Sequence, residues 1–161
     1  RSNVWSIAII EEHKLMAVGA DQGNLSIFSY ETKKHITDLY GHVSYVNDII
    51  YFPETKRMIS ACAEGNIIIW EYGAKEEFVQ KNLITGLPYI YRIIPLSSQN
   101  FVLIYNKKQY VEIYDIEERR SKKRIDAFSS EGGLSLYVDL KSNNIIAGGR
   151  DRSLCVIGNS N

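Results

Sequence analysis

The feature that most constrains this chain is an internal repeat. Shifted by 42 residues, the first part of the sequence aligns with the next at many positions of identical type. The matched pairs include Val4 with Val46, Ile7 with Ile49, Met16 with Met58, Gly23 with Gly65 and Tyr30 with Tyr72. A further shift of 44 carries the second unit onto a third, and a weaker fourth unit follows. A period of this length is typical of supersecondary units that bury a core only by stacking on their neighbours.

Each unit consists of three apolar segments, usually followed by a more polar fourth, and turn residues separate them. In the second unit these segments are 45–51, 56–62, 66–72 and 77–84. Nearly continuous apolar runs are typical of strands buried on both faces, and a mixed run suits a strand that faces water. We therefore predict an all-β fold with units at about 4–40, 41–86, 87–130 and 131–161. A generic β-sandwich is the alternative, but sandwiches do not repeat at this period.

Charge and cysteine content restrict the setting and the partners. The chain has 161 residues with 19 basic and 19 acidic side chains, so the basic excess typical of nucleic-acid-binding proteins is missing. Cys62 and Cys155 form no disulfide framework and suit a reducing compartment. No apolar run approaches the ~20 residues that cross a bilayer. We expect a cytoplasmic protein, with the nucleus as the alternative, with no membrane span and no nucleic-acid partner.

The second unit carries a specific motif. Gly41-His42 is followed by a segment that runs from Ser60 to Glu64-Gly65, and then by an apolar segment that closes in Trp70-Glu71. This pattern resembles the WD repeat, in which a Gly-His pair precedes Ser-x-Ser-x-Asp-Gly and an apolar strand ending in Trp-Asp. The resemblance covers the whole chain as a repeat, although only this unit shows the full signature. It implies β-propeller blades, each a four-stranded antiparallel sheet.

The resemblance also implies a hydrogen-bonded group inside the blade, formed by His42, Ser60, Glu64 and Trp70. A buried indole N–H needs an acceptor, and a hydroxyl group can supply it. Glu64 stands where the family usually has Asp, and its longer side chain changes the reach of the fourth link. His42, Ser60 and Glu64 also suit a catalytic triad. Because the motif places them inside a blade and away from any cleft, we interpret them as structural.

The other units depart further from the family pattern. The first has Phe28 in the place of the Trp and Gln22 in the acidic place. The third has Tyr114-Asp115 but Lys108 opposite the acid, and the fourth keeps Asp151 but has Ile157 for the Trp. We expect these blades to rely on packing. The last blade has no outer strand, and propellers of ~4–8 blades protect their edges by closing a ring. We therefore expect four repeats of a larger, seven-bladed propeller.

Motifs of enzymes are not found in the sequence. It contains neither a glycine-rich nucleotide loop nor a metalloprotease or nucleophile-elbow motif. We therefore predict no enzyme, no cofactor, and no catalytic, cofactor-binding or metal-binding residues. By family analogy the function is a protein-interaction scaffold or adaptor that binds one or more proteins or peptides. The alternatives are a regulatory segment of a larger multidomain enzyme and a propeller hydrolase with a central metal. For the hydrolase the axis-facing strands offer only Asn47, Asp48 and Asp139.

Two surface features are candidate contact sites. The loops that enter the inner strands carry Tyr and Arg, which are enriched in the energetic centres of interfaces. We predict a partner-binding rim there, formed by Ser44, Tyr45, Tyr89, Tyr91 and Arg92, with core packing as an equal alternative for Tyr91. The second feature is a basic run in the third unit, formed by Arg119, Arg120, Lys122, Lys123 and Arg124. It suits an acidic partner, a nuclear-import signal or a lipid headgroup. The favoured interpretation is a solvated hairpin whose charges discourage strand pairing.

Overall fold

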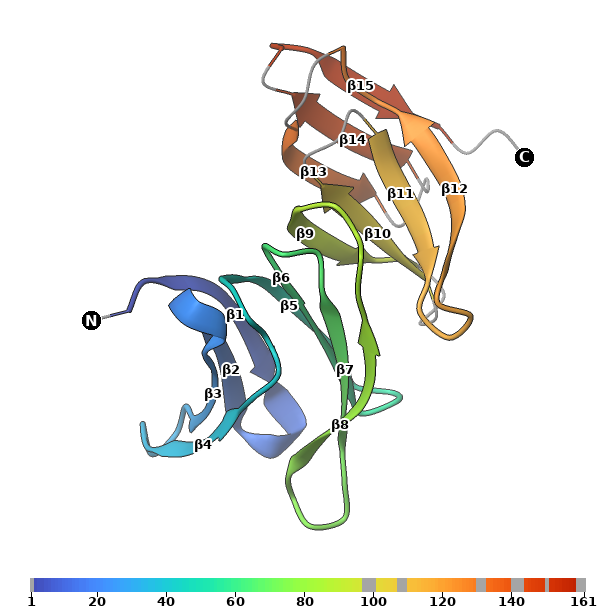
Figure 1. Ribbon diagram of the computed structural model, residues 1–161. Coiled ribbons are helices and arrows are strands. Elements are labelled where there is room, and N and C mark those ends of the chain that lie inside the picture. The colour runs from blue at the N-terminus through green and yellow to red at the C-terminus, as the bar shows by residue number, and fades with distance from the viewer. Residues whose placement is uncertain are drawn as a thin grey trace. The chain divides into compact units, whose positions relative to one another are not determined.

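The computed structural model describes residues 2–96, 101–106, 110–129, 133–139, 144–149 and 151–158. Its strands form four antiparallel sheets, each built from strands that follow one another in the chain (Figure 1). The prediction of an all-β fold made of consecutive blades is therefore confirmed. The chain divides into two compact units, residues 1–90 and 91–161, which are described separately.

The first blade is the sheet formed by β1 to β4. Its strands, joined in part by the short 3-10 turns η1 and η2, are β1 (Val4–Ile10), η1 (Glu11–His13), β2 (Leu15–Ala20), η2 (Asp21–Gly23), β3 (Leu25–Ser29) and β4 (His35–Leu39). The strands lie in the order β1-β2-β3-β4, with β1 and β4 at the two edges. On the two edge strands, β1 and β4, three side chains are buried: Ser6, Ile10 and Leu39.

The second blade repeats this order with β5 (Val46–Phe52), β6 (Arg57–Cys62), β7 (Ile67–Tyr72) and β8 (Phe78–Ile84). Strand register confirms the alignment of the two units. Met58 lies opposite Trp70 in the second blade, as Met16 lies opposite Phe28 in the first. Positions that match in the sequence therefore occupy the same place in the two sheets.

The first two blades share one apolar core. Side chains that lie opposite one another on neighbouring strands point to the same side of a sheet. We call the side that carries Ser60 and Trp70, or the matching residues of another blade, the front face, and the other side the back face. The core joins the back face of the first blade to the front face of the second, and its buried members are Ile10, Ala17, Leu25, Ile27, Leu39, Val46, Ile49, Met58, Ile68, Trp70 and Phe78.

Two matching glycines hold the turn between the second and third strands of these blades. Gly23 and Gly65 have φ angles of 79° and 75°, which side chains rarely adopt. A Cβ atom at Gly23 would lie 2.2 Å from the carbonyl oxygen of His42, and one at Gly65 would lie 1.8 Å from that of Leu87. Each turn therefore needs glycine for its backbone angle and for the close approach of the segment that follows its blade.

The second unit contains most of the third blade and the whole described part of the fourth. The third blade consists of β9 (Ile90–Pro95), β10 (Phe101–Asn106), β11 (Tyr110–Asp115) and β12 (Arg120–Asp126). The fourth has three described strands, β13 (Gly133–Asp139), β14 (Asn144–Gly149) and β15 (Leu154–Ile157). Their shared core contains Val111, Ala127, Phe128, Leu136, Ile145 and Ala147. Ile157 lies opposite Ile145, as Trp70 lies opposite Met58. Lys108 lies outside the described residues, and the larger seven-bladed ring stays a prediction.

Candidate functional site

The second blade contains a buried hydrogen-bonded group. His42 lies on the loop before β5, Ser60 lies on β6 and Trp70 lies on β7. The Ser60 hydroxyl oxygen accepts the indole N–H of Trp70 at 2.8 Å and lies 2.6 Å from Nε2 of His42. All three side chains are buried. The structure thus brings together three of the four residues that the family resemblance indicates.

Glu64, the fourth residue, lies apart from this group. Its side chain is exposed in the turn between β6 and β7. Among the described residues, Nδ1 of His42 is buried without a hydrogen-bond partner. Burial lowers the pKa of His42 from 6.5 to about 4, because the charged imidazolium is penalised away from water. The imidazole is therefore neutral at pH 7.

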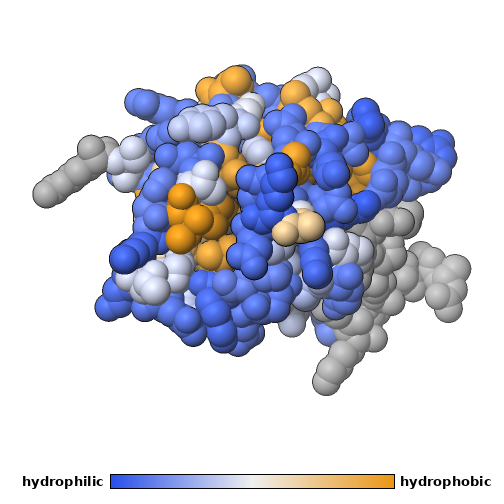
Figure 2. Space-filling model, turned by 90° about the horizontal axis from the view of Figure 1, so that it is seen from below, coloured by the Kyte–Doolittle hydropathy of each residue, from blue (hydrophilic) through white to orange (hydrophobic). Residues whose placement is uncertain are grey.

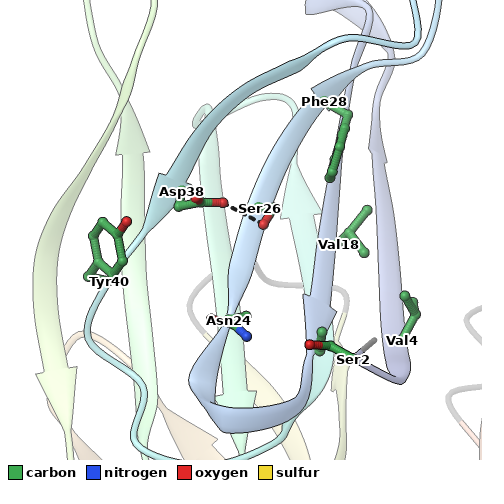
Figure 3. A pocket seen from close by; sticks show the side chains of 9 residues that line it. Ser2, Val4, Val18, Asn24, Ser26, Phe28, Asp38 and Tyr40 are labelled. Atoms are coloured by element: carbon green, nitrogen blue, oxygen red, sulfur yellow. Dashed lines mark hydrogen bonds between the residues drawn. The ribbon is translucent and has the colours of Figure 1, made fainter.

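The front face of the first blade is open where that of the second is buried. Val18 and Phe28 replace Ser60 and Trp70, and Ile7 and Ile9 on the same face are 58% and 54% exposed. A shallow hollow of about 320 Å³ lies on this face (Figure 3). It is lined by Ser2, Val4, Val18, Ala20, Asn24, Ser26, Phe28, Asp38 and Tyr40. On the face seen in Figure 2, apolar side chains gather in small groups separated by polar ones.

An aromatic pair lies where β1 and β5 begin. The rings of Trp5 and Tyr45 lie 5.7 Å apart between centroids, tilted at 44°. Both are accessible, with exposed fractions of 54% and 45%. The indole N–H of Trp5 donates to Oδ1 of Asp21 at 2.6 Å, and the backbone N–H of Asn3 donates to Oδ2 at 2.9 Å. We call Trp5, Tyr45 and Asp21 the aromatic rim.

A β-bulge brings Trp5 into the aromatic rim. Val4 pairs with Ala20 and Ser6 pairs with Gly19, so Trp5 is an extra residue in β1 without a partner on β2. The same irregularity occurs at Asn47 in β5 and at position 134 in β13. Bulges turn a side chain away from the alternating pattern and are frequent beside functional sites. The first, second and fourth blades thus share a bulge near the start of the inner strand.

The residues of the predicted rim are divided between the two units. Ser44, Tyr45 and Tyr89 belong to the first unit, whereas Tyr91 and Arg92 belong to the second. Tyr45 and Arg92 are exposed, and the other three are half-buried. Trp5 and Asp21 were not among the rim residues predicted from the sequence. A Trp at the position that matches Asn47 was the available signal, since Trp is strongly enriched in interface centres.

The basic run of the third blade is largely paired with carboxylates of its own hairpin. Nε of Arg120 donates to Glu118 at 2.6 Å, and Lys122 also donates to Glu118. The bond from Arg120 has the larger effect on the pKa of Glu118, and the two bonds together lower this pKa to about 2. Nε of Arg124 donates at 3.0 Å to the buried Glu112, and its guanidinium lies 5.0 Å from the centroid of the Tyr110 ring. Arg120, Lys122 and Arg124 of the basic run are thus engaged locally.

In the part of the chain that the structure describes, no group of three or more His, Cys, Asp or Glu side chains is arranged to hold a metal ion. Asp48 is buried, and Asn47 donates to the backbone oxygen of Ile90 at 2.8 Å. No helix within the same described ranges has the length and apolar character that crossing a membrane requires. Cys62 and Cys155 are free thiols.

Comparison with known proteins identifies the repeat. The family model described as "WD domain, G-beta repeat" matches residues 33–71. This range covers β4 of the first blade and β5 to β7 of the second, so the sequence repeat straddles two sheets. A relative named "Retinoblastoma-binding-like protein E", from Dictyostelium discoideum, is 30% identical over 59 residues. That alignment spans 35% of this chain and 11% of the relative. The match identifies a WD repeat at residues 33–71, and together with the four blade-like sheets it supports a WD-repeat fold for the described part of the chain.

Proposed function

We propose that this chain is a non-catalytic scaffold or adaptor whose aromatic rim binds a protein or peptide. WD-repeat blades form protein-interaction domains, and the relative from Dictyostelium discoideum is named for binding rather than for a reaction. The observation that carries the proposal is the exposure of Trp5 and Tyr45 side by side. Soluble proteins seldom leave a Trp and a Tyr in contact and half exposed, unless they have a role at an interface.

The aromatic rim is also held in place before a partner arrives. Asp21 fixes the indole of Trp5, and the carbonyl oxygen of Tyr45 accepts the N–H of Ala63 at 3.0 Å. Side chains that are already ordered lose little conformational entropy on binding, so more of the contact energy appears as affinity. The basic run is the weaker candidate for a partner contact, because Arg120, Lys122 and Arg124 are engaged with carboxylates.

Affinity purification with quantitative mass spectrometry tests this proposal. A double variant, Trp5→Ala with Tyr45→Ala, is compared with the wild-type chain and with Tyr137→Ala. Tyr137 is a matched control because it is an exposed aromatic residue on the fourth blade. We expect the double variant to lose at least one protein that the wild type and the control retain, with unchanged melting. An identical set of proteins for all three chains would contradict the proposal.

The cysteine side chains bear on the cellular location. Two free thiols, one buried and one half-buried, suit a reducing compartment. We therefore propose the cytoplasm, with the nucleus as the alternative. Imaging of the fluorescently tagged full-length protein tests this, and a secreted or lumenal signal would overturn it.

A further inference from the structure

We propose that the aromatic rim binds a positively charged side chain, arginine or lysine, of the protein partner. This inference rests on the proposed function, because it names the chemistry that the same residues recognise. Three features of the aromatic rim carry it: two aromatic side chains that are about half exposed, a carboxylate beside them, and a hydrogen bond from the Trp5 indole to that carboxylate.

The aromatic faces supply the first attraction. The face of an aromatic ring carries negative electrostatic potential, and a cation within ~6 Å of the ring centroid is attracted to it. The Trp5 and Tyr45 rings, tilted at 44° to one another, form an open angle rather than a closed stack. A planar guanidinium or an ammonium group can lie against either ring, while its aliphatic stem covers the rest of the apolar surface.

Asp21 supplies the charge that distinguishes a cation from other ligands. Its Oδ1 accepts the indole N–H of Trp5 and its Oδ2 accepts the backbone N–H of Asn3, and each carboxylate oxygen has more than one lone pair with which to accept. The hydrogen bonds from the backbone of Asn3 and the indole of Trp5 lower the pKa of Asp21 below its ordinary value. The carboxylate is therefore ionised at neutral pH, where it attracts a cation and repels a phosphorylated or acidic peptide.

The hydrogen bond between Trp5 and Asp21 joins the two elements. It holds the carboxylate at the edge of the indole ring at 2.6 Å, so ring face and negative charge stay in one fixed relation. Donation of the indole N–H to an anion also increases the electron density of the ring, which strengthens its attraction for a cation. In the second blade the bulge holds Asn47, whose amide donates to the backbone oxygen of Ile90. The cation-binding arrangement of the first blade is thus not repeated in the second.

Binding of short peptides to the full chain tests the inference. The probes are acetyl-Gly-Arg-Gly-amide, its lysine counterpart, and a citrulline counterpart that keeps the shape of arginine without its charge. Trp5 and Trp70 are the two tryptophans in the chain, and Trp70 is only 2% exposed. The indole N–H signal of Trp5 in an NMR spectrum of ¹⁵N-tryptophan-labelled protein therefore reports binding at the rim.

We expect saturable shifts of the Trp5 signal with the arginine and lysine peptides. The citrulline peptide should bind with an affinity that is weaker by about fivefold or more. Asp21→Asn should reduce the preference for arginine over citrulline by about fivefold. Asp38→Asn is the matched control, since this carboxylate on β4 is exposed and bonded to Ser26 at 2.6 Å. It should leave the arginine affinity unchanged.

Two outcomes separate the inference from the proposed function. Equal shifts for arginine and citrulline, or no shift with any of the three peptides, would overturn cation recognition. The proposed function would still stand if the Trp5→Ala and Tyr45→Ala double variant lost a protein partner. Arginine binding at Trp5 with an unaltered set of protein partners would instead support the cation site and contradict the proposed function.

Discussion

The first and second blades share a strand order and a register, yet they differ in how their front faces are built. In the second blade this face is covered by the first blade, and it carries Ser60 and Trp70 in a buried hydrogen-bonded group. In the first blade the same face is open and carries Val18 and Phe28. A buried indole N–H must be satisfied, whereas a phenyl ring needs no partner. The repeat therefore determines the backbone arrangement of each blade. The burial of each face determines which of its polar side chains need hydrogen-bond partners.

Truncating the matching aromatic residues should give the largest difference between the blades. Trp70→Ala should cost about 4 kcal/mol of unfolding free energy, because it empties a buried site and leaves Ser60 without its donor. Phe28→Ala should cost about 2 kcal/mol or less, because its ring is only half-buried. Denaturant unfolding of both variants measures this. Equal losses would show that the front face of the first blade is buried in solution.

The turn glycines give the next largest effect. Gly65→Ala should cost about 3 kcal/mol, because the new Cβ meets the Leu87 carbonyl oxygen and the backbone angle is strained. Gly86 is the matched control. Its φ angle is 80°, but a Cβ atom at this position would have no contact within 4 Å. Gly86→Ala should cost about 1 kcal/mol from the angle alone. Thermal unfolding of the two variants checks the difference, and a smaller loss at Gly65 would contradict the close approach.

Acid should lower the free energy of unfolding because it protonates His42. Its pKa is about 4 in the folded chain and 6.5 ordinarily, so the unfolded chain binds more protons between these values. The stability that depends on neutral His42 is fully present above pH 6.5 and is lost as the pH falls toward 4. The total loss is about 3 kcal/mol of unfolding free energy. Unfolding at stepped pH measures this loss. His42→Gln should remove most of the slope and the exposed His35→Gln should keep it, whereas the same slope in both would refute the assignment.

Glu64→Ala should have the smallest effect. The side chain is exposed and lies apart from His42, so we expect a change within about 0.5 kcal/mol. A loss above about 1.5 kcal/mol would show that the carboxylate reaches His42 in solution and completes the four-residue group. The same unfolding measurement decides this, with Glu54→Ala in an exposed turn for comparison.

Much of the fold could be predicted from the sequence, because the repeat reflects backbone geometry. The offset of 42 placed Met58 and Trp70 on Met16 and Phe28, and the strand register agrees. Apolar runs correctly indicated the buried strands β6 and β7 of the second blade, whereas the apolar run of β1 is largely exposed. These features are local or periodic, so they survive without knowledge of neighbouring sheets.

The site was less accessible to sequence reasoning. The bulge at Trp5 breaks the alternation that assigns side chains to faces, so the contact with Tyr45 and the bond to Asp21 could not be seen in the pattern. The outward direction of Glu64 depends on side-chain length in a tight turn. The pairing of Arg124 with Glu112 depends on the register of β11 and β12. Each of these follows from three-dimensional placement rather than from period.

The most direct test of the account is site-specific photo-crosslinking in cells that express the full-length protein. A photoreactive phenylalanine analogue replaces Tyr45 in the aromatic rim, and the same analogue replaces Tyr137 in a parallel strain as the matched control. We predict a discrete protein adduct from position 45 that is absent from position 137, and that disappears when Trp5→Ala is added. Adducts of equal yield and identity from both positions, or none from position 45, would contradict a protein-binding role for this rim.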